Sequence, residues 1–268
     1  MPILFNALLI SDCLAQMHAA SIVRETQEGA ANRLKEEYLN KMSDAIRQNN
    51  SKKMYHLLKE AVRDFKAITS PQKKLNKMGI VGEIYLKFNS FSHRHIIKQF
   101  QNDGVEVFPP QLLPFFMQSF VNRKVNKNYG FTESSVPEFV FNAVHALAQR
   151  NITKANKICT DFEYFTPISN IFDEAENAKE IIDLGCQFGE GWLIPAEIAA
   201  YYHKGIYNVV SLQPFGCIAN HVISKGLERK LKMKFPKLNL LFLDFDGGTS
   251  EVNVLNRVEL FKNAMFDH

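Results

Sequence analysis

Short apolar segments alternate with amphipathic segments along most of this chain, and this alternation constrains the fold more than any other feature. The apolar segments have the length of buried strands, and helical periodicity follows each of them. The five segments are residues 78–85, 105–108, 181–184, 207–212 and 238–243. Strands that alternate with helices usually pair in parallel, because the crossover helix returns the chain to the same end of the sheet. We therefore expect an α/β fold with a mostly parallel, Rossmann- or flavodoxin-like sheet and helices on both faces.

A helical segment precedes this α/β pattern. Residues 31–48 carry apolar side chains at helical spacing, residues 51–67 carry a second apolar stripe, and Ser51 is the expected N-cap of the second helix. This pattern predicts a helical hairpin. We expect a helical segment over 1–72 and an α/β domain over 73–268. An alternative divides the α/β domain into two sub-domains, 73–160 and 161–268.

The helices around the sheet are predicted from periodicity alone. The sequence predicts a helix over 112–121, a basic polar loop over 122–130, a helix over 137–149 and a basic helix over 222–234. Apolar side chains share one face of the third of these segments, namely Val140, Val144 and Leu147. Ser250 is expected to cap a final helix. Its predicted buried stripe consists of Leu255, Val258, Phe261 and Met265.

The composition argues against several classes of protein. With 268 residues, 46% hydrophobic and 22% charged, the chain has the composition of an ordinary globular protein. A net charge of +4 is too small to indicate nucleic-acid binding. We find no secretory signal and no run of about 18 apolar residues, so we expect no membrane span and a cytoplasmic location. The four cysteines form no C-x-x-C pair, which argues against a zinc ribbon and favours free thiols.

Three loops in the last third of the chain follow predicted strands. They cover residues 185–192, 213–221 and 244–251. In a parallel sheet the carboxyl ends of the strands lie at one edge, where α/β proteins bind their ligands. We therefore expect the three loops to form one site.

Cys217 is the most informative residue of these loops. It follows the apolar run 207–212 and a Gln-Pro-Phe-Gly turn, at the expected start of a helix. Unpaired N–H groups at a helix N-terminus favour a thiolate, which can act as a nucleophile or as a metal ligand. His221 lies four residues later and is a candidate base. The third alternative is that Cys217 is only a packed small residue.

The glycine loop has the spacing G-x-x-x-G-x-G and lacks the lysine of a P-loop. It is a weak candidate for a phosphate cradle, and the alternative is a tight turn that buries Trp192. Cys186 in this loop is a second thiol near a helix start. If the loops hold a cofactor, we expect it to contact Gly189, Gly191, Gln213 and Gly216.

The third loop, DFDGGT at 244–249, is similar to the motif of haloacid-dehalogenase-type phosphatases. Those enzymes use a strand-end Asp as nucleophile and a second Asp as acid/base, with Mg²⁺. Here an extra Gly precedes Thr249, and no chain follows for the later strands of that fold. The alternative is a solvated turn, with Asp244 and Asp246 in structural roles.

Several motifs together resemble one family. They are GIVGEIY at 79–85, GEGW at 189–192, QPFGC at 213–217 with Asn220 and His221, and SEVNVLNR at 250–257. In this order, over nearly the whole chain, they resemble the 2-hydroxyacyl-CoA dehydratase component D family. They are most similar to the C-terminal part of the large acyl-CoA dehydratase activase-related proteins.

The resemblance implies α/β domains that hold an oxygen-sensitive [4Fe–4S] cluster through three cysteines per subunit. An ATP-dependent activase passes an electron to that cluster, which supports radical loss of water from a 2-hydroxyacyl-CoA. By position, Cys217 resembles the C-terminal cluster cysteine of the family, and thiolates are the usual ligands of such clusters. The implied metal ligands are Cys217 and, as a completing ligand, Cys186.

The chain also departs from the family pattern. The other cluster cysteines of the large proteins lie in an upstream domain, the Cys-Tyr-Pro segment is absent, and no actin-like ATPase motif is found. A cluster would therefore be incomplete unless Cys186, His221 or a partner chain completes it. The expected partners are an ATP-dependent activase or a cysteine-bearing dehydratase chain, with an acyl-CoA. The sequence assigns no catalytic residue. The alternatives are a non-catalytic interaction module and a Mg²⁺-dependent phosphotransferase.

Overall fold

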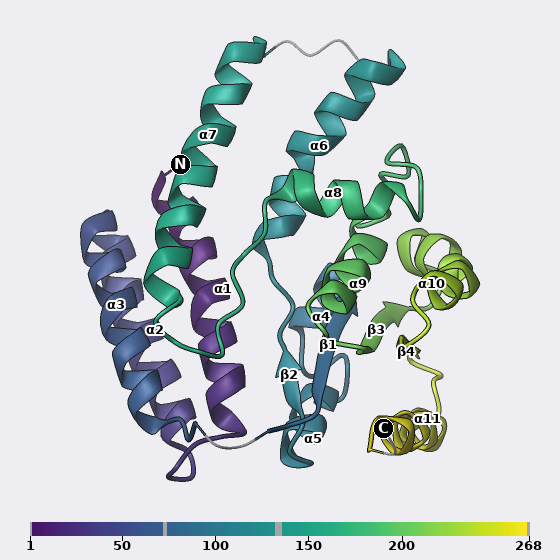
Figure 1. The fold of residues 1–268 in the computed structure, drawn as a ribbon, viewed down its shortest axis with the longest axis horizontal. Helices are drawn as coiled ribbons and strands as arrows, with labels where there is room; N and C mark the ends of the chain where they lie inside the picture. The colour runs from purple at the N-terminus through teal and green to yellow at the C-terminus, as the bar shows by residue number, and fades with distance from the viewer. Residues whose placement is uncertain (1, 72–73, 132–135, 267–268) are drawn as a thin grey trace. The chain divides into compact units, whose positions relative to one another are not determined.

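The computed structural model describes residues 2–71, 74–131 and 136–266 (Figure 1). The chain divides into two compact units, a helical unit and an α/β unit. The helical unit comprises Met1–Lys74, Gln111–Leu113 and Ser134–Asn170, and the α/β unit comprises Leu75–Pro110, Pro114–Glu133 and Ile171–His268. The helical unit thus contains a section around 138–159 that we expected in the α/β domain.

The N-terminal helices of the helical unit lie side by side at the purple and blue end of the colour scale in Figure 1. The helices of this unit are α1 (Pro2–Ile22), α2 (Ala30–Arg47), α3 (Ser51–Ile68) and α7 (Glu138–Cys159). Helices α2 and α3 form the predicted hairpin, in which Tyr38 and Phe65 are fully buried with ring centroids 6.5 Å apart. The N-cap of α3 is Asn50 rather than Ser51, because the Asn50 side chain accepts a hydrogen bond from the Lys53 amide.

Helix α1 is long and apolar enough to cross a membrane, judged by length and composition alone. The stretch Ile3–Ile22 has a mean hydropathy of 1.3, and 56% of the scored window is buried inside the structure. The stretch is not a continuous apolar run, because polar side chains such as Asp12 interrupt it, but they do not lower the mean hydropathy enough to exclude it as a candidate. Core helices of soluble proteins and N-terminal signal sequences share these properties, so α1 is weak evidence for a membrane span. Each of the two units is compact by itself, which is consistent with a soluble protein.

The α/β unit contains a parallel sheet, as expected, and the sheet is all-parallel with four strands. The strands are β1 (Lys77–Gly82), β2 (Glu106–Phe108), β3 (Asn208–Pro214) and β4 (Asn239–Phe245). Their order in the sheet is β2-β1-β3-β4, with Met78 opposite both Val107 and Asn208. This is the order of the first four strands of a flavodoxin-like sheet, so the predicted fold class is confirmed.

One predicted strand, at 181–184, is absent, and the loop after it therefore does not leave a strand. The amides of Ile181 and Ile182 both donate to the Ala178 carbonyl at 2.8 Å and so continue the last turn of α8 (Ile171–Lys179). The Asp183 side chain then accepts a hydrogen bond from the Gly185 amide and closes a turn. The apolar run was correctly predicted to be buried, because Ile181 packs into the core.

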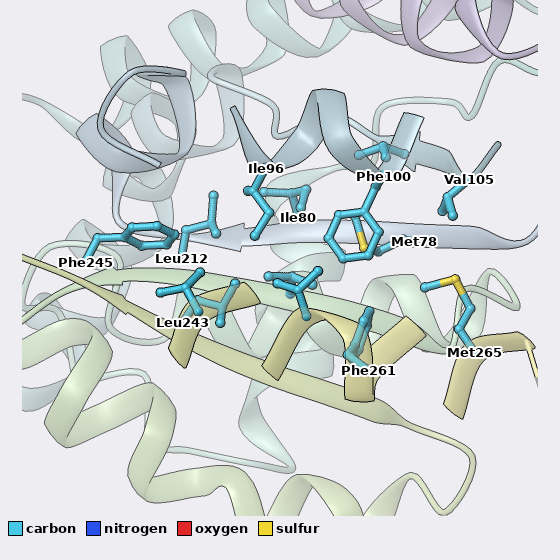
Figure 2. Close-up of a cluster of buried hydrophobic side chains, with 14 of the residues drawn as sticks. Met78, Ile80, Ile96, Phe100, Val105, Leu212, Leu243, Phe245, Phe261 and Met265 are labelled. Atoms are coloured by element: carbon cyan, nitrogen blue, oxygen red, sulfur yellow. The ribbon is translucent and has the colours of Figure 1, made fainter. Parts of the chain in front are cut away.

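Helices cover both faces of the sheet. On one face, α5 (Ile96–Asn102) and α11 (Glu251–Phe266) pack through Phe100 and Phe261, whose rings meet edge to face with centroids 6.0 Å apart (Figure 2). On the other face, α9 (Leu193–His203) and α10 (Glu228–Lys234) cover alternate residues of the strands, such as Leu240 and Phe242. Successive strand residues point to opposite faces, and both faces are apolar because both are covered.

Several helix boundaries differ from the predictions. Helix α6 (Leu113–Tyr129) includes residues 122–129 of the predicted loop at 122–130. The loop prediction was wrong because these polar side chains lie on a helix surface. The predicted single helix over 222–234 is divided into a π-helical segment η1 (Ile218–Ser224), a short 3₁₀ turn η2 (Lys225–Leu227) and α10. In α11 the buried stripe begins at Val254 rather than at Leu255, which is exposed. In α7 the predicted apolar face is exposed at Val140, Val144 and Leu147.

Candidate functional site

The candidate site lies where β1 and β3 end. The chain leaves β1 towards β2 on one side, whereas β3 and β4 lie on the other, so the strand order reverses between β1 and β3. The Glu83 amide donates to the Leu212 carbonyl at 3.0 Å, and the Glu83 carboxylate caps the short helix α4 (Ile84–Phe88). Gly82 has a φ of +125° and packs directly on Leu212, so only glycine fits there. The loops after β1 and β3 are therefore held together at one edge.

The loop after β3 positions Cys217. Gly216 adopts a φ of +78°, and the Cys217 amide then donates to the Pro214 carbonyl at 3.3 Å. Cys217 is the N-cap residue of η1, and its carbonyl accepts the His221 amide at 2.7 Å. The Asn220 side-chain amide donates to the Cys217 sulfur at 3.2 Å. The structure thus places Cys217, partly exposed, at the start of a helical segment, as the sequence predicts.

His221 is directed at Asp244 rather than at Cys217. Its Nε2 lies 2.5 Å from Asp244 Oδ1, and its Nδ1 accepts a hydrogen bond from the Gly216 amide at 3.4 Å. The hydrogen-bond pattern assigns the proton of neutral His221 to Nε2. Both ring nitrogens are therefore engaged, and His221 is not placed to take a proton from the thiol. This arrangement argues against a Cys/His nucleophilic pair.

Asp244 is held in a network of donors at the end of β4. Gln213 Nε2 and His221 both bond to its Oδ1, and Arg257 Nη1 lies 3.9 Å from Oδ2. Burial raises the pKa of Asp244, but the hydrogen bonds from His221 and Gln213 outweigh this effect and lower it. Gln213 is thus placed at the site, where it orients Asp244.

The glycine loop packs against η1. An added Cβ at Gly191 would meet the Cys186 carbonyl, and an added Cβ at Gly189 would lie 3.7 Å from Ala219. Gly189 also has a φ of +57°. The loop turns into α9, where the buried Trp192 donates to Asn122 Oδ1 at 2.7 Å. These contacts favour the tight-turn interpretation of both glycines.

A buried group of charged side chains lies beside this loop and was not predicted. Lys87 from α4 is 2% exposed, and its Nζ lies 3.5 Å from Glu197 Oε1 on α9. Glu190 from the glycine loop is 3% exposed, and burial raises its pKa, while Lys87 acts in the opposite direction. The only sequence signal was a Lys and two Glu within otherwise apolar segments.

The loop after β4 forms a closed turn. Asp246 Oδ1 accepts the Gly248 amide at 2.6 Å, and the Asp246 amide donates to Thr249 Oγ1 at 3.1 Å. Arg94, from the segment before α5, donates through Nη2 to the Thr249 carbonyl at 2.8 Å. The loop thus lies at the same edge as the loops after β1 and β3, and Asp246 has the structural role of a turn residue.

The described residues contain no group of three or more His, Cys, Asp and Glu side chains that could hold a metal ion. Cys186 and Cys217 are partly exposed in the α/β unit, whereas Cys13 and Cys159 are buried in the helical unit. The two thiols named as metal ligands are therefore the accessible ones, but they do not by themselves form a metal site.

The chain matches no family model, no curated protein and no solved structure.

Proposed function

We propose that this protein is an iron–sulfur-associated component of a 2-hydroxyacyl-CoA dehydratase or activase-type system. Cys217 supplies one thiolate ligand to a [4Fe–4S] cluster, and the protein serves electron transfer or dehydration of a CoA ester. The observation that carries the proposal is the setting of Cys217, a partly exposed thiol at the point where the strand order reverses. The motifs around Cys217 support the same function by resemblance.

Two contacts favour a ligand over a nucleophile at this position. The Asn220 amide donates to the sulfur, and hydrogen bonds to cysteine sulfurs tune a bound cluster. His221, the nearest candidate base, bonds to Asp244 and to the Gly216 amide instead. A thiol without an adjacent base is better suited to metal binding, because a metal ion deprotonates the thiol that it binds.

The described residues fit one ligand position and do not fit a whole cluster, because no three-residue ligand group is found among them. We therefore derive no reaction step through the cluster. The remaining ligands come from Cys186 together with other chains. The candidates for these further ligands are an upstream cysteine domain, a cysteine-bearing dehydratase subunit and the ATP-dependent activase that donates the electron.

Anaerobic reconstitution with iron and sulfide tests the proposal. In the presence of a soluble thiol, which can fill the ligand positions that the chain leaves open, wild type is expected to develop thiolate–iron absorption at about 400 nm. Cys217→Ser should lose this absorption, whereas Cys159→Ala, which removes a buried thiol of the helical unit, should keep it. Equal absorption in wild type and Cys217→Ser would contradict the assignment of Cys217 as a ligand.

A second candidate function is a non-catalytic interaction module of the same fold. Large apolar side chains are exposed on the segments after β1 and β3 and on the glycine loop, and exposed apolar groups of this kind are found at protein contact surfaces. They are Tyr85, Phe91, Phe188, Phe215 and Val222. If neither wild type nor Cys217→Ser takes up iron, this function is favoured.

The phosphotransferase alternative has less support. Asp244 is tied to His221 and Gln213, and Asp246 closes a turn with Gly248. These contacts are all made through Oδ1, and Arg257 Nη1 lies 3.9 Å from Asp244 Oδ2, so Asp244 is held in a network of donors and Asp246 in a turn. Release of phosphate from a simple ester that is lost in Asp244→Asn would restore this alternative.

A further inference from the structure

Two of the four cysteines meet inside the helical unit. Cys13 lies on α1 and Cys159 is the last residue of α7, and both side chains are 0% exposed. The two thiols share a hydrogen bond, so their sulfur atoms lie next to each other. Both cysteines are free. The fold therefore brings together two thiols that lie on separate helices and far apart in the sequence.

The packing around the pair holds α1 and the end of α7 in a fixed register. The two helices contact each other directly (Figure 1). Just beyond Cys159, the Thr166 amide donates to Gln16 Oε1 on α1 at 3.1 Å. The buried face of α7 consists of small or apolar side chains, namely Ala148, Ile152, Ala155 and Cys159. The two sulfur atoms are therefore held together by packed helices.

The surroundings of the pair keep it reduced when no oxidant is present. The hydrogen bond with Cys159 and burial raise the pKa of the Cys13 thiol well above its usual range, and Asp12 adds to the rise. The thiolate is the reactive form of cysteine, so a protonated and buried thiol reacts slowly. Cys186 and Cys217 differ from the pair because both are partly exposed.

We propose that Cys13 and Cys159 form a reversible disulfide that locks α7 onto α1 under oxidising conditions. The helical unit is built mainly from two pieces of the sequence, Met1–Lys74 and Ser134–Asn170. Cys13 belongs to the first piece and Cys159 to the second, so the bond joins the two pieces covalently. Disulfides of cytoplasmic proteins are usually transient bonds of this redox-sensing kind. The bond does not involve Cys217, so the inference goes beyond the proposed function and stands whether or not the chain binds iron.

A peroxide is the class of oxidant that this step uses. Cys159 ends α7, and helix ends open more readily than helix centres, so its sulfur is reached first. Hydrogen peroxide transfers one oxygen atom to this thiol, which becomes a sulfenic acid, and the peroxide becomes water. The Cys13 sulfur then attacks the sulfenic sulfur, the S–S bond forms, and the hydroxyl group leaves as a second water with the Cys13 proton. The two thiols thus lose two electrons and two protons in total, and a dithiol reductant reverses the step.

Peroxide oxidation of the folded full chain tests the proposal. The double variant Cys186→Ser/Cys217→Ser removes the two partly exposed thiols and leaves the buried pair. It is reduced, treated with hydrogen peroxide, alkylated in urea and analysed by mass spectrometry. The matched control is the same variant with the further change Cys159→Ala, which removes one thiol of the pair. Circular dichroism shows whether each variant is folded, and the cross-linked peptide is also sought in wild type.

The double variant is expected to lose about 2 Da and to yield two peptides joined through Cys13 and Cys159. Dithiothreitol should restore both thiols. The oxidised form should melt about 5 °C or more above the reduced form, because the bond restricts the unfolded chain. The control variant should form no such bond and should show no rise in melting temperature on oxidation.

Two results would overturn the proposal. The first is that Cys13 and Cys159 stay alkylatable, or gain oxygen without forming the bond, at a peroxide concentration that oxidises Cys217 in wild type. The second is that the cross-linked form melts below the reduced form, because a bond that strains the helices does not lock them. Both results come from wild type and the double variant, so they decide the question even where the control variant fails to fold.

Discussion

Replacing Glu197 by glutamine tests how the buried charges beside the glycine loop affect stability. The Glu197 side chain is 15% exposed, and its Oε1 lies 3.5 Å from Lys87 Nζ. Burial raises the pKa of Glu197 from 4.5 to about 7, although Lys87 lowers it, and the neighbouring carboxylates of Glu174 and Glu190 add to the rise. The folded protein therefore holds a proton on Glu197 that the unfolded chain has already lost.

This difference makes stability depend on pH. Between pH 4.5 and about 7 the folded state binds the proton and the unfolded state does not, so the free energy of unfolding decreases as the pH rises. The contribution is fully present below the unfolded pKa and is lost once the pH exceeds the folded pKa. A rise of this size corresponds to roughly 3 kcal/mol. Glutamine has nearly the same shape as protonated glutamate and removes this dependence.

Urea unfolding at about pH 5 and pH 8.5 measures the effect. Trp192 is the only tryptophan of the chain and is fully buried, so its fluorescence reports on the α/β unit. Relative to wild type, Glu197→Gln should be more stable at the higher pH than at the lower pH by roughly 3 kcal/mol.

The control is Glu180→Gln. The hydrogen bond from Lys234 lowers the pKa of this exposed carboxyl, so it stays ionised in both states across the tested range and its replacement should show no pH dependence. A stability difference for Glu197→Gln that is the same at both pH values would refute the reasoning.

Three further predictions concern the fold and the thiols. Gly82→Ala should destabilise the α/β unit by roughly 3 kcal/mol in urea unfolding, because its φ is +125° and the new Cβ would collide with the Leu212 backbone. Phe261→Ala should cost about 4 kcal/mol in the same assay, because Phe261 is buried in the core and meets Phe100 edge to face. A thiol reagent analysed by mass spectrometry should label two cysteines in the folded chain and four after unfolding, and equal labelling of all four in the folded chain would contradict this. The two expected labelled residues are Cys186 and Cys217, and the protected ones are Cys13 and Cys159.

The sheet was predictable because its signal is local. Buried parallel strands are short continuous apolar runs, and 207–212 and 238–243 both read in this way. The run at 181–184 reads in the same way but is a turn, since apolarity reports burial and not backbone conformation. Likewise, 122–130 is polar because it lies on the surface of α6, and polarity alone does not end a helix.

The candidate site was predictable only in part, for the same reason. The position of Cys217 at the start of η1 follows from the Gln-Pro-Phe-Gly turn directly before it. The orientation of the His221 side chain does not follow from the local sequence. It depends on Asp244, which lies on β4, 23 residues away. The spacing of Cys217 and His221 suggested a pair, and the tertiary contact with Asp244 decides against it.

The groups that matter most at the sheet edge are paired across long stretches of sequence. Arg94 and Thr249 are 155 residues apart, and neither carries a signal of the other in its local pattern. The left-handed backbone at Arg94 also carries no sequence signal, because arginine is not among the residue types that favour this conformation. Lys87 and Glu190 are ionisable side chains that are buried at one edge with incomplete pairing. The protein would be more stable with apolar residues at such positions. These polar groups therefore lower its stability, as expected where a fold keeps polar groups for a ligand.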